Sequence, residues 1–166
     1  MQWRTLKEDL RLLPKVARVG RALARKHATV GTLVRDQAQA IPDRVLLRFE
    51  SESVTYAAFN AGVNAFAAVF RQAGVGREPV ALMMENSPTL LMAQAAAAKI
   101  GAIAALINTH ISGAQLTHAL RASTARHVFT DATCLPRAVA PPESASLTIW
   151  GQGDPAQLPP HVEPLD

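Results

Sequence analysis

From residue 29 onward, the apolar positions of the chain alternate between helix-like and strand-like spacing. Thr29 is a favourable N-cap for a helix that runs to about Ala40, and the Ile-Pro-Asp sequence at residues 41–43 ends it. The stretch RVLLRFESESVTY that follows predicts a hairpin of two short strands, with its turn around residues 50–52. The body of the protein is therefore expected to begin with a helix and a hairpin.

The next segment has a helical spacing of large apolar side chains between residues 56 and 72. Phe59, Val63 and Phe66 recur at intervals of three or four residues, as expected for the buried face of one helix. Gly74 is the natural end of this helix, because glycine adopts the left-handed conformation that closes many helices.

The run between residues 87 and 107 contains one charged residue, Lys99, and its length raises the question of a membrane span. Local signals favour a strand, a helix and a second strand instead. PVALMM has the length and composition of a short buried strand, and AIAALI those of another. Asn86 or Ser87 can cap the helix between them, with Pro88 at its first position.

This helix also has a defined end. Lys99 falls in its last turn, where a cation complements the helix dipole, and Gly101 follows as the stop. A helix between these signals is about 12 residues long, whereas a membrane span requires about 20. The run is therefore predicted to be a β-α-β unit and not a membrane span.

The alternation of strands and helices continues beyond this unit. Ser112 is expected to cap a helix that ends near Ser123, and RHVFTD is expected to be the next strand. Strands that alternate with helices predict a parallel sheet with right-handed crossovers. The predicted fold class is α/β, in the form of a partial parallel-sheet lobe with flanking helices.

The chain changes character after Asp131. Five of its eleven prolines fall between residues 141 and 160, around SLTIW, which can form a last strand. The final 16 residues are expected to form an exposed tail. The predicted organisation is a basic amphipathic arm at residues 1–28, an α/β lobe at residues 29–150 and a proline-rich tail at residues 151–166.

Positive charge is concentrated in the arm. Residues 1–27 contain eight Lys or Arg against Glu8 and Asp9, a net charge of +6, while residues 28–166 contain nine against eleven acidic residues, a net charge of −2. A basic body would have favoured nucleic acid as a partner, whereas a basic arm indicates only an anionic surface of some kind. No nucleic acid partner is expected.

On a helical wheel, seven of the eight basic residues of the arm fall within about one third of the circumference, with an apolar stripe beside them. The basic set is Arg4, Lys7, Arg11, Lys15, Arg18, Arg21 and Arg25, and the stripe is Trp3, Leu6, Leu10, Leu13 and Ala17. Pro14 breaks or kinks the segment. Two hypotheses stay open. Residues 4–25 bind an anionic membrane surface, or the stripe packs on the body of the protein.

Candidate chemical groups are few. The histidines show no metal-ligand spacing with one another or with Cys134; they are His27, His110, His118, His127 and His161. Cys134 is the single cysteine, so the chain forms no intrachain disulfide, which suits a reducing compartment. It is interpreted as a passive thiol near a strand end.

Two further segments are candidate functional loops. Glu85 follows a strand and precedes a helix, a common position for active residues in open sheets, although a solvated carboxylate is the simpler interpretation. GQGD at residues 151–154 is similar to part of a phosphate loop, but prolines follow it instead of a helix, which favours a plain turn. The sequence therefore assigns no catalytic, cofactor-binding or metal-binding residue.

From about Thr29 to Asp131 the chain resembles the N-terminal part of adenylate-forming acyl-CoA synthetases. The likeness is strongest to the long- and very-long-chain fatty acid branch, which includes the fatty acid transport proteins. It rests on IPDRVLLRFESESVTY, VALMMENSP and KIGAIAALINTHISGAQLTHALRASTARHVFTD. Positions at the family's spacing are Asn64, Ala67, Lys99, Gly101, Ala105, Leu106, Asn108, Leu116 and His118.

The resemblance implies a fold and a reaction, but no site residue. Family members convert a fatty acid, ATP and CoA to acyl-CoA, AMP and pyrophosphate, with Mg²⁺. Their phosphate loop, adenine-contacting motif, metal-binding glutamate and catalytic lysine lie downstream of the matched segment. The sequence also departs from the family at Ala58, where an acidic residue is usual, and at residues 77–79, where the loop is one residue shorter.

Two functions follow as hypotheses. The first is the N-terminal part of a fatty acyl-CoA synthetase, inactive alone, whose partner is the remainder of the synthetase. The alternative is a standalone, non-catalytic module that binds a membrane or a full-length synthetase. No uninterrupted apolar h-region occurs in the first 27 residues, so a cytoplasmic protein is expected, peripheral at a membrane if the arm binds lipid.

Overall fold

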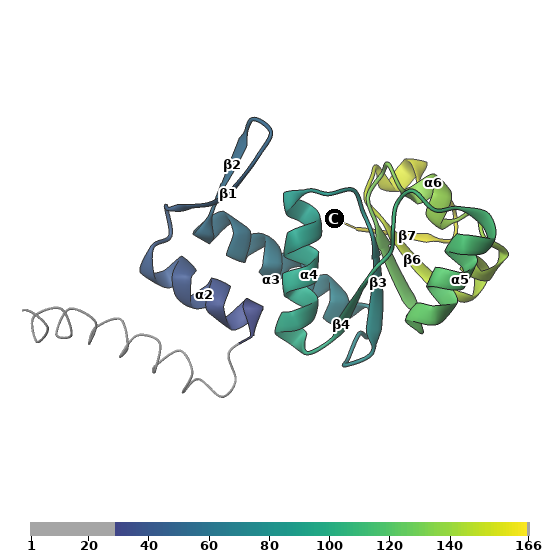
Figure 1. Ribbon diagram of the computed structural model, residues 1–166, viewed down its shortest axis with the longest axis horizontal. Coiled ribbons are helices and arrows are strands. Elements are labelled where there is room, and N and C mark those ends of the chain that lie inside the picture. Colours follow the sequence, from purple (N-terminus) through teal and green to yellow (C-terminus); the bar gives the residue numbers. More distant parts are fainter. Residues whose placement is uncertain (1–28, 166) are drawn as a thin grey trace, which may run out of the picture.

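A computed structural model describes residues 29–165 of the chain (Figure 1). The predicted arm at residues 1–28, including its expected helix, lies outside the described residues. The helices are α2 (Val30–Ala40), α3 (Tyr56–Gln72), α4 (Pro88–Ile100), α5 (Gly113–Ser123) and α6 (Leu135–Ala138), with 3₁₀ turns η1 (Pro142–Ser146) and η2 (Pro155–Gln157). The strands are β1 (Val45–Phe49), β2 (Glu52–Thr55), β3 (Pro79–Met83), β4 (Ile103–Leu106), β5 (His127–Thr130), β6 (Thr148–Gly151) and β7 (Val162–Pro164).

Strands β3 to β7 form one parallel sheet in the order β4-β3-β5-β6-β7, and β1 and β2 form the predicted antiparallel hairpin. The α/β fold class with a parallel-sheet lobe is confirmed. Figure 1 shows α3 and α4 on one side of the sheet and α5 and α6 on the other, with the hairpin projecting beside α3. The part of the chain that the structure describes has no helix long and apolar enough to cross a membrane.

The sheet separates two apolar cores because successive strand residues point to opposite faces. On β3, Val80 and Leu82 belong to the core under α3 and α4, and Ala81 and Met83 to the core under α5. All four side chains are at most 1% exposed. A strand buried on both faces reads as the continuous apolar run PVALMM, as the sequence predicted.

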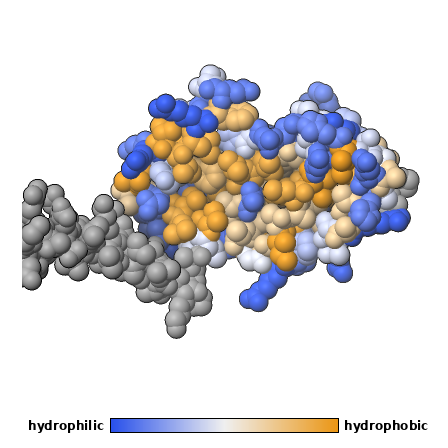
Figure 2. All heavy atoms as spheres, viewed as in Figure 1, coloured by the Kyte–Doolittle hydropathy of each residue, from blue (hydrophilic) through white to orange (hydrophobic). Residues whose placement is uncertain are grey.

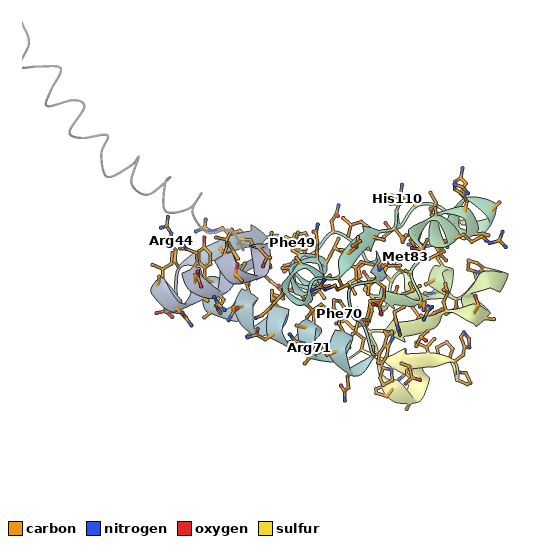
Figure 3. The ribbon with its side chains drawn as sticks, turned by 90° about the horizontal axis from the view of Figure 1, so that it is seen from below. Arg44, Phe49, Phe70, Arg71, Met83 and His110 are labelled. Atoms are coloured by element: carbon orange, nitrogen blue, oxygen red, sulfur yellow. The ribbon has the colours of Figure 1, made fainter. Side chains whose placement is uncertain are left out.

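Aromatic side chains fill the first of these cores. The ring centroids of Phe70 on α3 and Phe129 on β5 are 4.4 Å apart, and Phe129 stacks on Trp150 of β6 at 5.7 Å. Figure 3 shows Phe70 in the interior of the molecule, between α3 and the sheet. These contacts attach α3 to the centre of the sheet across a sequence separation that no local pattern reveals.

Helix caps account for most of the confirmed element boundaries. Thr29 and Thr32 form a reciprocal capping box. The Thr29 N–H donates to the Thr32 hydroxyl at 2.8 Å, and the Thr32 N–H donates to the Thr29 hydroxyl at 3.2 Å. The Ser87 hydroxyl accepts from the Leu90 N–H at 3.2 Å, and Gly101 ends α4 in the left-handed conformation at φ 84°. The predicted side-chain cap at Ser112 is absent, although α5 begins at the next residue as expected.

Most described residues between 152 and 161 are exposed, but the end of the expected tail belongs to the sheet. Residues 162–164 form β7, which pairs with β6 through Ile149 and Val162, and both Val162 and Leu165 are 8% exposed. The prolines of this segment are the reason that the sequence predicts an exposed tail. However, β7 is the edge strand of the sheet, and an edge strand accommodates a residue such as Pro164 that has no N–H to donate.

Candidate functional site

The order of strands places a reversal point at the carboxyl edge of the sheet, between β3 and β5, and we call the region between the loops that leave these two strands the crevice. After β3 the chain crosses through α4 to β4 on one side, and after β5 it continues through α6 to β6 on the other side. The loops that leave β3 and β5 therefore diverge although the two strands are neighbours. In open α/β sheets, this reversal point is where ligands bind.

Asp131 joins the two diverging loops. Its carboxylate accepts the backbone N–H of Glu85, in the loop after β3, at 2.6 Å. It also accepts the backbone N–H of Cys134, at the start of α6, at 2.7 Å. Hydrogen bonds to a charged acceptor are stronger than neutral ones, so Asp131 fixes the floor of the crevice.

The side chains of three residues meet above this floor. Arg137 Nη2 lies 3.6 Å from Glu85 Oε1, an ion pair whose side chains are 39% and 43% exposed. The Cys134 thiol donates weakly to Glu85 Oε1 at 3.7 Å, and Arg137 Nη2 donates to Cys134 Sγ at 4.0 Å. Glu85 therefore remains partly open to solvent, as in the simpler interpretation, and it also pairs with Arg137 across the crevice.

Cys134 is suited to packing and not to nucleophilic attack. Its side chain is fully buried. Burial, reinforced by the Asp131 carboxylate, raises the pKa of the thiol from its ordinary value near 9.0 to about 12. Because the thiolate is the reactive form, the thiol is inert near neutral pH, which agrees with the predicted passive role.

A cavity of about 310 Å³ opens beside this cluster, between the loops that follow β3 and β4. Its polar lining includes Glu85, Asn86, Asn108 and His110, over apolar walls from Leu82 and Leu106. Asn108 Oδ1 accepts the backbone N–H of His110 at 2.8 Å and so shapes the turn that presents the imidazole. Figure 3 shows His110 at the periphery of the molecule, above the buried Met83.

Sequence reasoning singled out Glu85 and Cys134 but treated them separately, and it missed Asp131 and Arg137 as members of one site. Only the pairing of β3 with β5 brings these residues together, across 46 to 52 positions of the chain. His118, His127 and His161 do not line this cavity. The GQGD segment is a turn as predicted: Gly151 ends β6, and Asp154 caps the short η2.

The polar side chains of the crevice are better suited to binding a ligand than to catalysing a reaction. Within residues 29–165, no group of three or more His, Cys, Asp or Glu side chains could hold a metal ion. The crevice provides one guanidinium, already paired with Glu85, and no glycine-rich turn leading into a helix. The described residues of the crevice can orient a polar group, and none of them forms a glycine-rich cradle for a triphosphate.

Comparison with known proteins agrees with this architecture. Residues 34–162 match the family of AMP-binding enzymes, and the chain belongs to that family. It is 42% identical over 94 residues to the medium/long-chain-fatty-acid–CoA ligase FadD6 of Mycobacterium tuberculosis, over 56% of this chain and 16% of the relative. It is 31% identical over 96 residues to the 3-hydroxybenzoate–CoA ligase of Aromatoleum sp., over 57% of this chain and 18% of that relative.

Solved structures give the same result for the fold. The N-terminal domain of FACL13 from Mycobacterium tuberculosis superposes with a TM-score of 0.66 and 28% identity, over 75% of this chain and 34% of that one. A benzoate CoA ligase from Burkholderia xenovorans LB400 shares the fold, with a TM-score of 0.69 and 20% identity over 76% of this chain and 26% of that one. The chain spans about a sixth of the length of FadD6.

Proposed function

We propose that the chain forms the N-terminal lobe of an ATP-dependent ligase that joins medium- or long-chain fatty acids to CoA. The observation that supports this substrate class is the 42% identity to a fatty-acid–CoA ligase, against 31% to a 3-hydroxybenzoate–CoA ligase over a segment of similar length. Membership of the fatty acid transport protein branch stays a prediction from the sequence.

The described residues do not fit ATP or Mg²⁺ by themselves. Transfer of the adenylyl group to a carboxylate requires cations and backbone N–H groups around the developing charge on phosphorus. Arg137 is the cation at the crevice, and Glu85 already pairs with it. We therefore assign the lobe a structural role. It contributes the sheet and one wall of a larger site, and the remainder of the ligase supplies the groups that act on ATP.

A chimera tests this proposal. Residues 34–162 would replace the matching segment of FadD6, and fatty-acid-dependent exchange between ATP and pyrophosphate would be measured. We expect the chimera to retain exchange with decanoate within about tenfold of FadD6, a change of about 1.4 kcal/mol in the barrier. The 166-residue chain alone should give no exchange above a blank without protein.

Two results would contradict the proposal. One is a chimera that unfolds cooperatively, and so is folded, yet has lost exchange. The other is exchange by the chain alone. The alternative of a standalone binding module depends on the arm, which lies outside the described residues, and it stays a prediction.

A further inference from the structure

An apolar groove runs between the hairpin and helix α4, on the side of the molecule opposite to α5. One section has a volume of about 480 Å³ and is lined by α2, β1, α3 and α4. A second section of about 270 Å³ continues it toward the start of α4, and both sections share Leu47 and Leu91. The groove therefore follows α4, which at 13 residues is roughly 20 Å long.

The larger section of the groove is lined almost entirely by apolar residues, whereas Arg48, Asn86 and Ser87 also line the smaller section. Among the described residues of the larger section, Gln94 is the single polar side chain, beside Val30, Leu47, Phe59, Leu91 and Ala95. Figure 2 shows hydrophobic side chains gathered over α2, the base of the hairpin and α4.

Some of these side chains are unusually open to solvent. Val30 is 57% exposed and Leu91 is 46% exposed. Contiguous exposed apolar surface of this kind marks a binding face. A cavity of about 150 Å³ already admits a benzene ring, so the larger section has room for an aromatic and several aliphatic side chains.

The chain itself provides an occupant with matching chemistry. Residues 3–17 include the apolar stripe Trp3, Leu6, Leu10, Leu13 and Ala17. Pro14 interrupts this stretch, so in a helix the part of the stripe from Trp3 to Leu13 would be about 15 Å long, which fits within the length of α4. Its basic residues lie on another face of the same wheel, so they would stay in water while the stripe is buried.

Connectivity favours this occupant over a free partner. The arm joins the body at Thr29, and the next residue, Val30, lines the groove. The 16 residues from Leu13 to Thr29 can span up to about 50 Å, more than the length of the groove. A segment on the same chain also has an effective concentration on the order of millimolar.

We propose that the apolar stripe of residues 3–17 packs into the groove between the hairpin and α4. The arm then covers the exposed side chains of α2 and α4, and its basic face adds positive charge to this side of the protein. This inference is independent of the ligase proposal, because it concerns the outer face of α4 and not the crevice at the carboxyl edge of the sheet.

Trypsin cleavage of the arm in the full chain tests the proposal, since the arm contains eight Lys or Arg. Leu91→Lys places a charge in the groove at a half-exposed position, so the fold is retained. The matched control is Ile103→Lys, on the edge strand β4, at a side chain that is 60% exposed and outside the groove. We expect Leu91→Lys to accelerate cleavage on the N-terminal side of Thr29 roughly tenfold, because the packed arm would no longer bury a leucine at this position. Ile103→Lys should leave the cleavage rate unchanged.

Leu10→Glu in the arm, which adds a charge without adding a trypsin site, should reproduce the effect of Leu91→Lys. Combining the two substitutions should add little more, because both remove the same contact. Equal cleavage rates for Leu91→Lys, Ile103→Lys and the unaltered chain would overturn the proposal. Protection that disappears on dilution would also overturn it, because the occupant would then be a second copy of the chain.

Trp3 fluorescence provides an independent readout. The chain has two tryptophans, so Trp150→Phe leaves Trp3 as the single reporter and retains an aromatic ring beside Phe129. We expect blue-shifted emission without lipid, and a red shift after Leu91→Lys. Emission that shifts to the blue only when phosphatidylglycerol vesicles are added would overturn the proposal and identify a membrane surface as the occupant.

Discussion

At the scale of single residues, the crevice depends on Asp131 more than on its visible ion pair. The Asp131 carboxylate accepts two short backbone hydrogen bonds from different loops, while Glu85 and Arg137 form a pair whose side chains are well exposed to solvent. Exposed ion pairs contribute little to stability, whereas buried or partly buried hydrogen bonds to a charge contribute more.

Replacing Asp131 by Ala should therefore destabilise the fold more than replacing Glu85. We expect Asp131→Ala to lower the free energy of unfolding by about 2–3 kcal/mol, because two N–H groups lose a charged acceptor. Glu85→Gln should lower it by less than about 1 kcal/mol. Urea denaturation of the two variants measures this difference, and equal losses would show that Asp131 does not join the loops.

The Cys134 thiol allows a second test at this scale. Because burial raises its pKa to about 12, the folded chain should react very slowly with iodoacetamide at pH 8, and urea should restore ordinary reactivity. Because the pKa of the Cys134 thiol is higher in the folded state than in the unfolded state, the neutral thiol stabilises the fold. This contribution is fully present below pH 9, the ordinary pKa of the thiol, and is lost as the pH rises from 9 toward 12. Rapid labelling without denaturant would contradict the buried placement.

At the scale of elements, two glycines set how closely the helices on one side of the sheet pack. A Cβ on Gly31 of α2 would lie 2.6 Å from Lys99 Cβ and 3.0 Å from Lys99 Cα on α4. A Cβ on Gly62 of α3 would lie 2.3 Å from Met92 Sδ. Backbone-anchored atoms cannot rotate away, whereas the end of a methionine side chain can.

The two Gly→Ala variants should consequently differ. We expect Gly31→Ala to destabilise the fold by about 1–3 kcal/mol, because α2 must move away from α4. Gly62→Ala should stay within about 1 kcal/mol of the unaltered chain, since alanine favours the helix and Met92 can change rotamer. Thermal unfolding of both variants measures the two losses of stability. A larger loss for Gly62→Ala would indicate that Met92 cannot adapt.

The sequence predicted most elements because their ends have local signals. The bounds of α2 and α4 were predicted from the caps at Thr29 and Ser87 and from Gly101, which is left-handed. The central strands were predicted from their continuous apolar runs. β7 was missed because its prolines resemble those of a loop, and only the neighbouring β6 makes an edge strand of it. Asp131 and Arg137 were missed for the same reason, since their site exists only after β3 and β5 pair.

At the scale of the whole molecule, the lobe exposes apolar surface at two places. One is the groove along α4, for which we propose the arm as occupant. The other is the edge strand β4, where Ile103 is 60% and Leu106 is 54% exposed. A sheet edge with such side chains is suited to contact with further polypeptide, as expected of a lobe that spans about a sixth of its relative FadD6.

Exchange between ATP and pyrophosphate in matched chimeras tests the central claim most directly. Residues 34–162 would be placed in FadD6 and, in parallel, in the 3-hydroxybenzoate–CoA ligase of Aromatoleum sp. Our account predicts decanoate-dependent exchange in the first chimera and loss of most exchange in the second. Exchange retained with 3-hydroxybenzoate and lost with decanoate, in two folded chimeras, would contradict the assignment to fatty acids.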